Sequence, residues 1–317
     1  MEAPASSQTL RQRGGFASRA MDAGTNSWKP SRRPQPIDVA YAMDSLRCQN
    51  AIVAKMTSAS LQRKVLGQCR RAARDGLQRL LGSFGYVVYR RPTRDIEFDA
   101  RFLKMYRTCA PFTGTSVERM YALYQAVGYV VARGIPGSFV ECGVWRGGSS
   151  MLAAMTLLES GNRNRDLYLY DTFAGMSAPS DKDVTVSGEK AGTIWRPRLG
   201  AGWGADGTSL DEVKESLYST GYPRDQITFV KGKVEDTLPG TAPPKIAILR
   251  LDTDWYESTY HELCHLFPLV SPGGVLIIDD YGYWLGARDA VDQYLSEQHV
   301  DMLLNRIDLT GRMGIRT

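Results

Sequence analysis

The 317-residue sequence predicts an α/β protein built on an open, parallel sheet. The first observation is a pair of apolar runs, Ile246–Leu251 and Val275–Ile278, which are typical of strands buried on both faces of such a sheet. The second is that both runs end in carboxylates, because open α/β sheets bind ligands at the carboxyl ends of their strands. The third is the segment Val140–Ser150, whose order of apolar residues, glycines and helical pattern indicates a strand, a turn and a helix.

The first hundred residues differ in composition from the rest. Residues 1–36 are rich in Ser, Gly, Pro and Arg and poor in large apolar residues, so we expect a disordered tail, with an organelle-targeting peptide as the alternative. Residues 37–100 are predicted to form a helical extension that caps an active site or makes a dimer contact. Its basic amphipathic pattern also fits a partner or a membrane surface. The main domain then spans residues 101–317.

The elements of the main domain follow in order. A helix is predicted over Val117–Ala132, and the turn Gly134–Gly137 leads into the first strand. The glycine turn after this strand opens a helix around Met151–Leu158, and Leu167–Tyr170 forms the second strand. The long polar segment Ser177–Ser209 is predicted to be a structureless loop, either a lid over a binding site or surface disorder.

The glycine turn is a candidate cofactor loop. Its spacing differs from the dinucleotide motif G-x-G-x-x-G, because Glu141 opens it and its glycines fall between Gly143 and Gly148. This arrangement, in which an acid precedes the glycines and a second strand ends in Asp171, suits S-adenosylmethionine. That cofactor has a cationic sulfonium and amino group, which an acid can bind, and a ribose diol. Glu141 would lie near the methionine end, Asp171 would accept hydrogen bonds from the ribose, and Ser149 or Ser150 would cap the helix. The alternative is that the glycine turn has only a structural role, because such turns occur throughout α/β proteins.

Four acids at the ends of two neighbouring strands predict a metal site with a base beside it. Asp252 and Asp254 follow one apolar run, and Asp279 and Asp280 follow the other. One Asp after a strand is commonly a turn former or a helix cap, but four at one sheet edge favour a hard cation such as Mg²⁺, which prefers oxygen ligands. Magnesium that leaves room for two further oxygens favours a substrate with adjacent hydroxyls, one of which a nearby carboxylate deprotonates.

From about Met105 to Arg316 the chain resembles the macrocin O-methyltransferase family, enzymes that methylate sugar hydroxyls on antibiotics with S-adenosylmethionine and magnesium. Five blocks carry the resemblance: Phe139–Gly148, Leu169–Met176, Val230–Gly232 with Glu235–Pro239, Leu251–Thr259, and Pro272–Gly274 through Gly282. The resemblance implies a class I methyltransferase (Rossmann-like) fold with a doubly wound, mostly parallel, seven-stranded sheet.

The resemblance also implies roles for single residues. Asp252, Asp279 and Asp280 would be the metal ligands, and Asp254 would be the catalytic base. The adenine would lie near Gly232–Asp236. The candidate cofactor-binding residues are therefore Glu141, Gly143, Gly147, Ser149, Asp171, Thr172, Phe173, Glu235, Asp236 and Asp252.

The expected acceptor is a sugar hydroxyl, with a vicinal diol, of a natural product such as a macrolide glycoside. The aromatic segment Tyr281–Arg288 is placed to shape its pocket or to pack as core. Three alternatives remain open: a catechol-type small molecule, a glycolipid or polysaccharide sugar, and a protein that keeps the fold for binding alone. A nicotinamide oxidoreductase lacks the proper glycine spacing.

A rival motif, H-E-x-x-H, occurs at His261–His265 and is typical of zinc metalloproteases. On a helical wheel, Tyr256, Tyr260 and Leu263 form the apolar stripe, and the two histidines project from the opposite side. We therefore expect exposed histidines rather than zinc ligands, since catalytic zinc also needs a third ligand in a cleft.

Composition restricts the partners and the location. The net charge of +5 without a clustered aromatic and basic motif gives no support for nucleic-acid binding, and no run of about 18 apolar residues predicts stable membrane insertion. Five cysteines without a C-x-x-C pair favour a reducing compartment, so we expect a cytoplasmic protein. A homodimer is the default expectation for this size and type.

Overall fold

The computed structural model describes residues 95–198 and 208–317. The predicted tail, residues 1–36, and nearly all of the predicted extension, residues 37–100, lie outside the described residues. The described segments belong to one compact unit, Arg91–Thr317. It opens with the 3-10 turn η1 (Asp95–Phe98) and helix α3 (Ala100–Cys109), followed by η2 (Ala110–Phe112).

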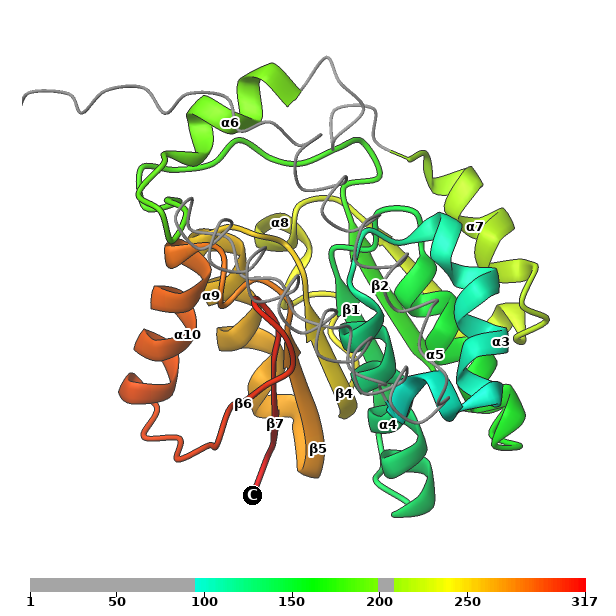
Figure 1. Ribbon diagram of the computed structural model, residues 1–317. Coiled ribbons are helices and arrows are strands. Elements are labelled where there is room, and N and C mark those ends of the chain that lie inside the picture. Colours follow the sequence, from blue (N-terminus) through cyan, green and yellow to red (C-terminus); the bar gives the residue numbers. More distant parts are fainter. Residues whose placement is uncertain (1–94, 199–207) are drawn as a thin grey trace, which may run out of the picture. The chain divides into compact units, whose positions relative to one another are not determined.

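A seven-stranded sheet runs through this unit (Figure 1). Its strand order is β3-β2-β1-β4-β5-β7-β6. The first five of these strands pair in parallel, whereas β7 is antiparallel to both β5 and β6. The strands are β1 (Ser138–Cys142), β2 (Leu167–Asp171), β3 (Ile227–Lys231), β4 (Ile246–Leu251), β5 (Val270–Ile278), β6 (Asn305–Arg306) and β7 (Arg312–Ile315). The predicted doubly wound, mostly parallel sheet is confirmed, and the order reverses between β1 and β4, where such folds bind ligands.

Helices cover both faces of the sheet, because successive side chains of a strand point to opposite faces. Phe139 of β1 belongs to the apolar core on one face and its neighbour Val140 to the core on the other. The first core is covered by α3, α4 (Val117–Ala132), α5 (Gly148–Glu159) and α7 (Leu210–Tyr218). The second is covered by α8 (Val234–Thr237), α9 (Tyr256–Leu266) and α10 (Leu285–Glu297), and η3 (Arg224–Gln226) and η4 (Phe267–Leu269) lead into β3 and β5.

Local sequence accounts for the two helices nearest the site. Helix α4 has the predicted bounds, and its N-cap Ser116 accepts a hydrogen bond from the Arg119 N–H at 3.1 Å. Helix α5 begins at Gly148, before the predicted start near Met151, because Gly147 at φ 89° turns the chain into the helix. A Cβ on Gly148 would lie 2.7 Å from the Phe112 backbone, so this helix start packs directly against the segment that precedes α4.

The prediction of a structureless segment over Ser177–Ser209 is wrong where the structure describes it. Helix α6 (Ala191–Arg198) lies in it, and isolated bridges pair Val184 with Lys190 and Thr185 with Trp284. The reason is Asp183, which is buried and accepts a hydrogen bond at 2.8 Å from the N–H of Tyr256, the first residue of α9. A helix N-terminus leaves such N–H groups free, so Asp183 ties the segment to α9.

The predicted faces of α9 are also partly wrong. His261 and His265 are half-buried rather than exposed, with ring centroids 4.4 Å apart. Glu262 is fully buried, so the helix turns this acid toward the sheet. Tyr256 and Tyr260 are half-buried and donate hydroxyl hydrogen bonds to acceptors on α10. Packing between α9 and α10 therefore rotates the helix away from the orientation that apolar periodicity alone predicts.

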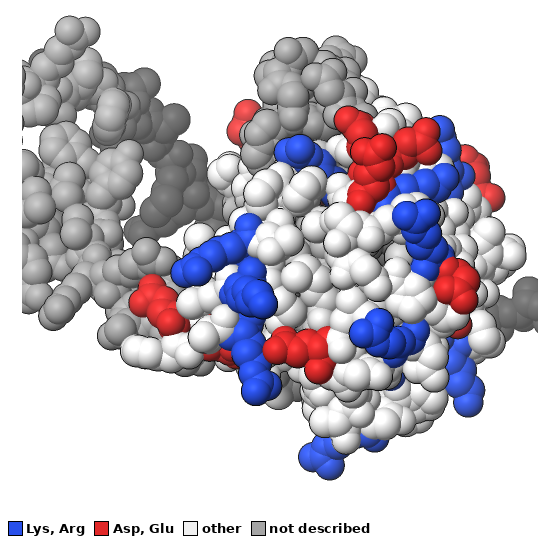
Figure 2. Space-filling model, turned by 90° about the vertical axis from the view of Figure 1, so that its right-hand side faces the viewer, with Lys and Arg blue, Asp and Glu red and all other residues white. Residues whose placement is uncertain are grey.

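The surface carries both signs of charge on the face that lies to the right in Figure 1. Figure 2 shows Lys and Arg side chains interspersed with Asp and Glu side chains over the described part of this face. A nucleic-acid footprint instead concentrates positive charge in a patch or stripe. Separately, none of the helices in the described ranges combines the length and apolar character that a membrane crossing requires.

Candidate active site

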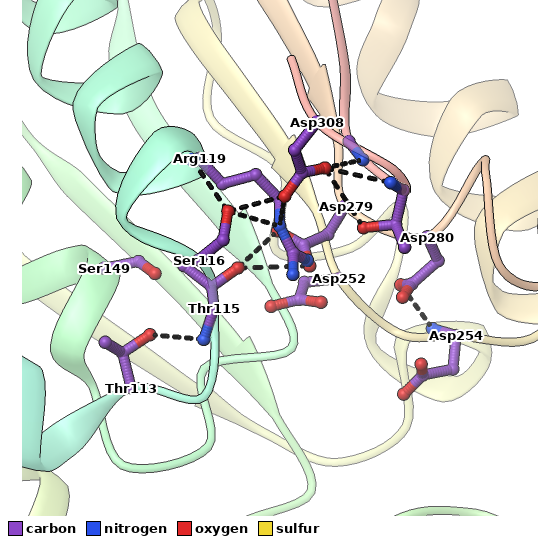
Figure 3. Close-up of polar contacts among 12 residues, drawn as sticks. Thr113, Thr115, Ser116, Arg119, Ser149, Asp252, Asp254, Asp279, Asp280 and Asp308 are labelled. Carbon is purple, nitrogen blue, oxygen red and sulfur yellow. Dashed lines mark hydrogen bonds and ion pairs between the residues drawn. The ribbon is translucent and has the colours of Figure 1, made fainter. Parts of the chain in front are cut away.

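Three carboxylates meet at the carboxyl edge of the sheet, at the centre of Figure 3. Asp252 follows β4, and Asp279 and Asp280 follow β5. Leu251 pairs with Ile278 in register, which brings the residues that follow these strands side by side. One carboxylate oxygen from each of the three acids lies within 4.8 Å of the others. The structure thus brings together the acids that the sequence placed at two strand ends.

Arg250, in strand β4, is a buried counterion of these acids on the side that faces the protein interior. Its side chain is only 3% exposed. One guanidinium nitrogen, Nη1, donates to Glu141 at 2.7 Å and to Asp252 at 2.8 Å, while Nη2 donates to Asp279 at 2.5 Å. A buried arginine is tolerated only with such partners, and charge-assisted bonds of this kind fix geometry. Arg250 therefore fixes Asp252 and Asp279, two of the three acids in this acidic cluster, from the protein interior.

A second arginine approaches the cluster from α4. Arg119 donates through Nη1 to Oδ2 of Asp279 and through Nε to Asp308 at 3.0 Å (Figure 3). The Thr115 hydroxyl also contacts Asp279, at 3.1 and 3.3 Å from its two oxygens. Asp308 lies between β6 and β7, so the antiparallel hairpin contributes to the site along with the parallel strands.

Asp254 lies beside the cluster in a conformation that suits a separate role. Its φ of 67° is unusual for a residue other than glycine. Its N–H donates to Asp280 at 3.2 Å, and its carboxylate accepts a hydrogen bond from the Trp284 indole at 2.8 Å. Trp284 is buried and packs edge-on against Trp255, with ring centroids 5.0 Å apart. The carboxylate of Asp254 is thus aimed by a rigid aromatic pair.

Burial and crowding raise the pKa values of two acids, Asp254 and Asp280. Burial, followed by the charge of Asp252, raises the pKa of Asp254 to about 6. Burial and then the charges of Asp254 and Asp252 raise the pKa of Asp280 well above its ordinary range. Like charges this close disfavour ionisation of all of them together, and a cation among them would lower these pKa values again.

The glycine loop lies at the same edge of the sheet. Gly143 has φ 84°, and a Cβ there would collide with the backbone carbonyl of Asp252, so glycine permits the β1 and β4 ends to touch. Asp171, at the end of β2, accepts hydrogen bonds from the N–H groups of Val144 and Trp145 at 2.7 and 2.9 Å. It also accepts the Phe173 N–H at 2.8 Å. Asp171 therefore fixes the shape of the loop from the neighbouring strand.

Glu141 points into the protein beside this loop. It is 1% exposed and accepts hydrogen bonds from Arg250 and from the Ser150 hydroxyl. Burial, opposed by the charge of Arg250, raises its pKa to about 7. Ser149 is buried and its hydroxyl lies 3.7 Å from the sulfur of Met120. In this structure Glu141 and Ser149 support the loop from inside.

The remaining candidate residues lie at two further positions. Thr172 donates to the Gly175 carbonyl at 2.5 Å, and the buried Phe173 has φ 48°, so both belong to a tight turn after β2. Glu235 and Asp236 are exposed in the first turn of α8. These positions border the same edge of the sheet, and within the described residues they form no hydrogen bond or ion pair with the acidic cluster.

Residues 73–313 match the family model of macrocin O-methyltransferases (TylF). The chain belongs to the macrocin O-methyltransferase family. The match begins before Met105, where the resemblance in the sequence becomes clear. Membership makes the chain an O-methyltransferase that uses S-adenosylmethionine, with the class I methyltransferase fold.

Relatives with named activities are identical to the chain at about a third of the aligned positions. It is 37% identical over 199 residues to the 8-demethyl-8-(2,3-dimethoxy-alpha-L-rhamnosyl)-tetracenomycin-C 4'-O-methyltransferase of Streptomyces olivaceus, covering 63% of this chain and 73% of that enzyme. It is 31% identical over 199 residues to the mycinamicin III 3''-O-methyltransferase of Micromonospora griseorubida, covering 63% and 76%. The solved structure of the O-methyltransferase NovP superposes with a TM-score of 0.57 at 31% identity, covering 65% of this chain and 82% of that one.

Several residues of the site escaped the sequence analysis. Arg250 gave a usable signal, because a charged residue inside an apolar strand requires buried partners. Trp284 lies in the aromatic segment that was predicted to border the acceptor. Arg119, Thr115 and Asp308 gave no signal, since only the packing of α4 and of the β6–β7 hairpin brings them to the acids.

Proposed function

We propose that this methyltransferase acts on a hydroxyl group of a sugar in a natural-product glycoside, with magnesium held by Asp252, Asp279 and Asp280. The observation that carries the proposal is the convergence of three carboxylates beside the glycine loop. The sugar is supported by the names of the relatives, one of which specifies a rhamnosyl group. A sugar with neighbouring hydroxyls suits such a site, because magnesium commonly keeps several coordination positions for water or substrate.

The donor set fits magnesium. All three groups are carboxylates, the oxygen ligands that hard cations prefer, and the set contains no sulfur or imidazole that would favour zinc or copper. Asp279 and Asp280 are nearly buried while Asp252 is partly exposed, so the cluster is supported from inside and open on one side. When bound, magnesium would supply positive charge that makes a nearby hydroxyl easier to deprotonate.

Asp254 is the proposed base. The Trp284 indole orients its carboxylate through a hydrogen bond at 2.8 Å, and the carboxylate would accept the proton of the acceptor hydroxyl. With magnesium bound beside it, Asp254 would be ionised at neutral pH, as a general base must be before it accepts a proton. The deprotonated oxygen then takes the methyl group from the donor's sulfonium, and holding the two reactants in line is the main contribution of the protein.

The donor site is proposed at the glycine loop. Gly143 and Gly147 adopt the left-handed conformations, with φ 84° and 89°, that shape the loop, and the α5 N-terminus presents free N–H groups. Four groups already donate to the Asp171 carboxylate, which has about four acceptor positions, so a ribose hydroxyl would replace the longest of these bonds, from the Thr172 hydroxyl at 3.4 Å. Glu141 acts through Arg250 and Ser150 in this proposal, while Thr172, Phe173, Glu235 and Asp236 would border the adenosine.

A methyl-transfer assay tests the proposal. Purified chain is incubated with S-adenosylmethionine that carries a labelled methyl group, with a panel of rhamnosides and a matched panel of catechols, in magnesium or in EDTA. We expect label in rhamnosides, dependent on magnesium. Label in catechols alone would replace the proposed acceptor class, and undiminished transfer in EDTA would remove the metal from the mechanism.

We also propose a cytoplasmic location and a homodimer. The three cysteines in the described ranges, Cys109, Cys142 and Cys264, are free thiols, which suits a reducing compartment. Burial raises the pKa of Cys109 to about 12, so this thiol is inert. Sedimentation of the full chain tests the dimer, and a monomer at micromolar concentration would contradict it.

A further inference from the structure

The two arginines that bind Asp279 differ in how they are held. Arg250 has a 3% exposed side chain and is enclosed by three carboxylates, those of Asp252 and Asp279 in the cluster and that of the buried Glu141. Arg119 is 16% exposed and divides its guanidinium between Asp279 and Asp308. Arg250 is therefore a fully enclosed counterion, whereas Arg119 is more exposed and makes only one of its two ion pairs with the cluster.

We propose that Arg119 is a displaceable counterion of the metal site. It occupies Oδ2 of Asp279 in the free protein and gives up this oxygen when magnesium binds. This inference rests on the proposed function, since it assumes that Asp279 is a magnesium ligand. It assigns to Arg119 a positioning role that sets the affinity for the cation, without contact to the reacting atoms.

The first argument is competition for one oxygen. Oδ1 of Asp279 is held by Arg250 from inside the protein. Oδ2 accepts from Arg119, whose side chain enters from α4 on the same side as Thr115 (Figure 3). An oxygen that is paired with a guanidinium is poorly placed to ligate a dication, because the two positive charges would stand a few ångströms apart.

The second argument is that Arg119 has a place to stay when it leaves Asp279. Asp308 accepts its Nε–H at 3.0 Å and is itself fixed by the N–H groups of Thr310 and Gly311 at 2.9 and 2.7 Å. The Ser116 hydroxyl donates at 2.5 Å to Oδ2 of Asp308, the same oxygen that accepts from Arg119. A rotation of the guanidinium end therefore keeps the link to Asp308 and frees Asp279.

The third argument is charge. One carboxylate oxygen from each of Asp252, Asp279 and Asp280 lies within 4.8 Å of the others, and Asp254 lies beside Asp280, so their negative charges repel one another. A cation from α4 relieves this repulsion while the metal is absent. The positive charge of Arg119 also opposes metal binding, so it lowers the affinity of this acidic site for magnesium.

The proposal makes a prediction of definite sign. If Arg119 competes with magnesium, Arg119→Gln tightens magnesium binding, by about tenfold or more for the loss of one positive charge within a few ångströms. If Arg119 only orients Asp279 for the metal, the same substitution weakens binding. The two roles therefore predict opposite changes.

Titration calorimetry with magnesium chloride on the full chain measures the change. The control is Arg133→Gln, which removes the same charge from an exposed residue at the other end of α4. It lies about 21 Å along the helix from Arg119, beyond the Debye length in 0.15 M salt, so its effect should stay under about twofold. Unchanged or weaker binding by Arg119→Gln overturns the proposal and leaves the proposed function intact.

Wild-type crystals grown with and without magnesium provide a second readout that needs no variant. We expect the ion on Asp252, Asp279 and Asp280, with the Arg119 guanidinium moved off Oδ2 of Asp279 and still paired with Asp308. Magnesium bound while Arg119 keeps its contact with that oxygen would overturn displacement. Absence of magnesium binding in both calorimetry and crystals would overturn the metal site and this inference together.

Discussion

Replacing Arg250 with methionine tests whether the acidic cluster depends on its buried counterion. The substitution keeps an unbranched side chain of similar length but removes the bonds to Glu141, Asp252 and Asp279 at 2.7, 2.8 and 2.5 Å. Glu141 and Asp279 are 1% and 5% exposed at their side chains, so they cannot recover water as a partner. Removing one partner of a buried ion pair destabilises a protein by about 3–5 kcal/mol.

The assay is urea unfolding at pH 8 in EDTA, followed by circular dichroism. In a separate thermal unfolding experiment, a loss of this size would lower the melting temperature by roughly 6–20 °C for a domain of this length. The matched control is Arg101→Met, because Arg101 is 79% exposed and pairs with Glu159 only at 3.9 Å. Such surface pairs contribute about 0–1 kcal/mol. A loss below about 1 kcal/mol for Arg250→Met would refute the reasoning.

The cause can be checked in a double variant. Adding Glu141→Gln to Arg250→Met removes one of the stranded charges while keeping the shape of the side chain. We expect the double variant to recover part of the lost free energy of unfolding, because fewer buried carboxylates then lack a counterion. A double variant that is less stable than Arg250→Met would show that packing, and not charge, dominates.

Two other predictions concern single acids. Asp254→Asn should lower kcat by about 100- to 10,000-fold, the usual contribution of a general base, with donor affinity unchanged by calorimetry; a rate within tenfold of wild type at saturating magnesium would remove Asp254 as the base. Glu141→Gln should change how stability depends on pH. The folded-state pKa of Glu141 is raised from 4.5 to about 7, so the folded protein keeps a proton that the unfolded chain releases. The contribution of this group to the free energy of unfolding is therefore full below pH 4.5 and falls by about 3 kcal/mol as the pH rises from 4.5 through 7. The Gln variant should lack this fall when the free energy of unfolding is measured against pH in EDTA. Parallel pH profiles for the two proteins would contradict the raised pKa.

The parts of the fold that sequence predicts well are those set by local pattern. The apolar runs Ile246–Leu251 and Val275–Ile278 lie within β4 and β5, and the acids after them form the cluster because parallel pairing puts strand ends at one edge. The bounds of α4 follow from its cap Ser116 and its apolar periodicity. In these cases one period and one capping residue decide the structure.

The parts that sequence did not predict depend on contacts between distant segments. Glycine and polar content suggested a structureless segment after Ser177, but buried Asp183 anchors it to α9. Composition cannot show that anchor, because it depends on where the N-terminus of α9 lies. Likewise, the burial of Glu262 follows from the packing of α9 against α10 and the sheet rather than from its own sequence pattern.

The roles of the cofactor-loop residues were predicted only in part. Asp171 was expected to face a ribose, and it does lie at the end of β2, yet three backbone N–H groups already bind it. Glu141 was expected near the methionine end of the donor, whereas Arg250 and Ser150 bind its carboxylate. A sequence gives the position of an acid on a strand, but its hydrogen-bond partners come from side chains that tertiary packing supplies.

The spread of the acidic site along the chain has a consequence for folding. Asp252 and Asp279 are 27 residues apart, whereas Arg119 is 160 residues from Asp279 and 189 from Asp308. Short loops close at lower entropic cost than long ones, so strands β4 and β5 can bring mutually repelling acids together before the arginine from α4 arrives. The last step of assembly then removes an electrostatic penalty, and refolding should accelerate at salt concentrations that screen the acids.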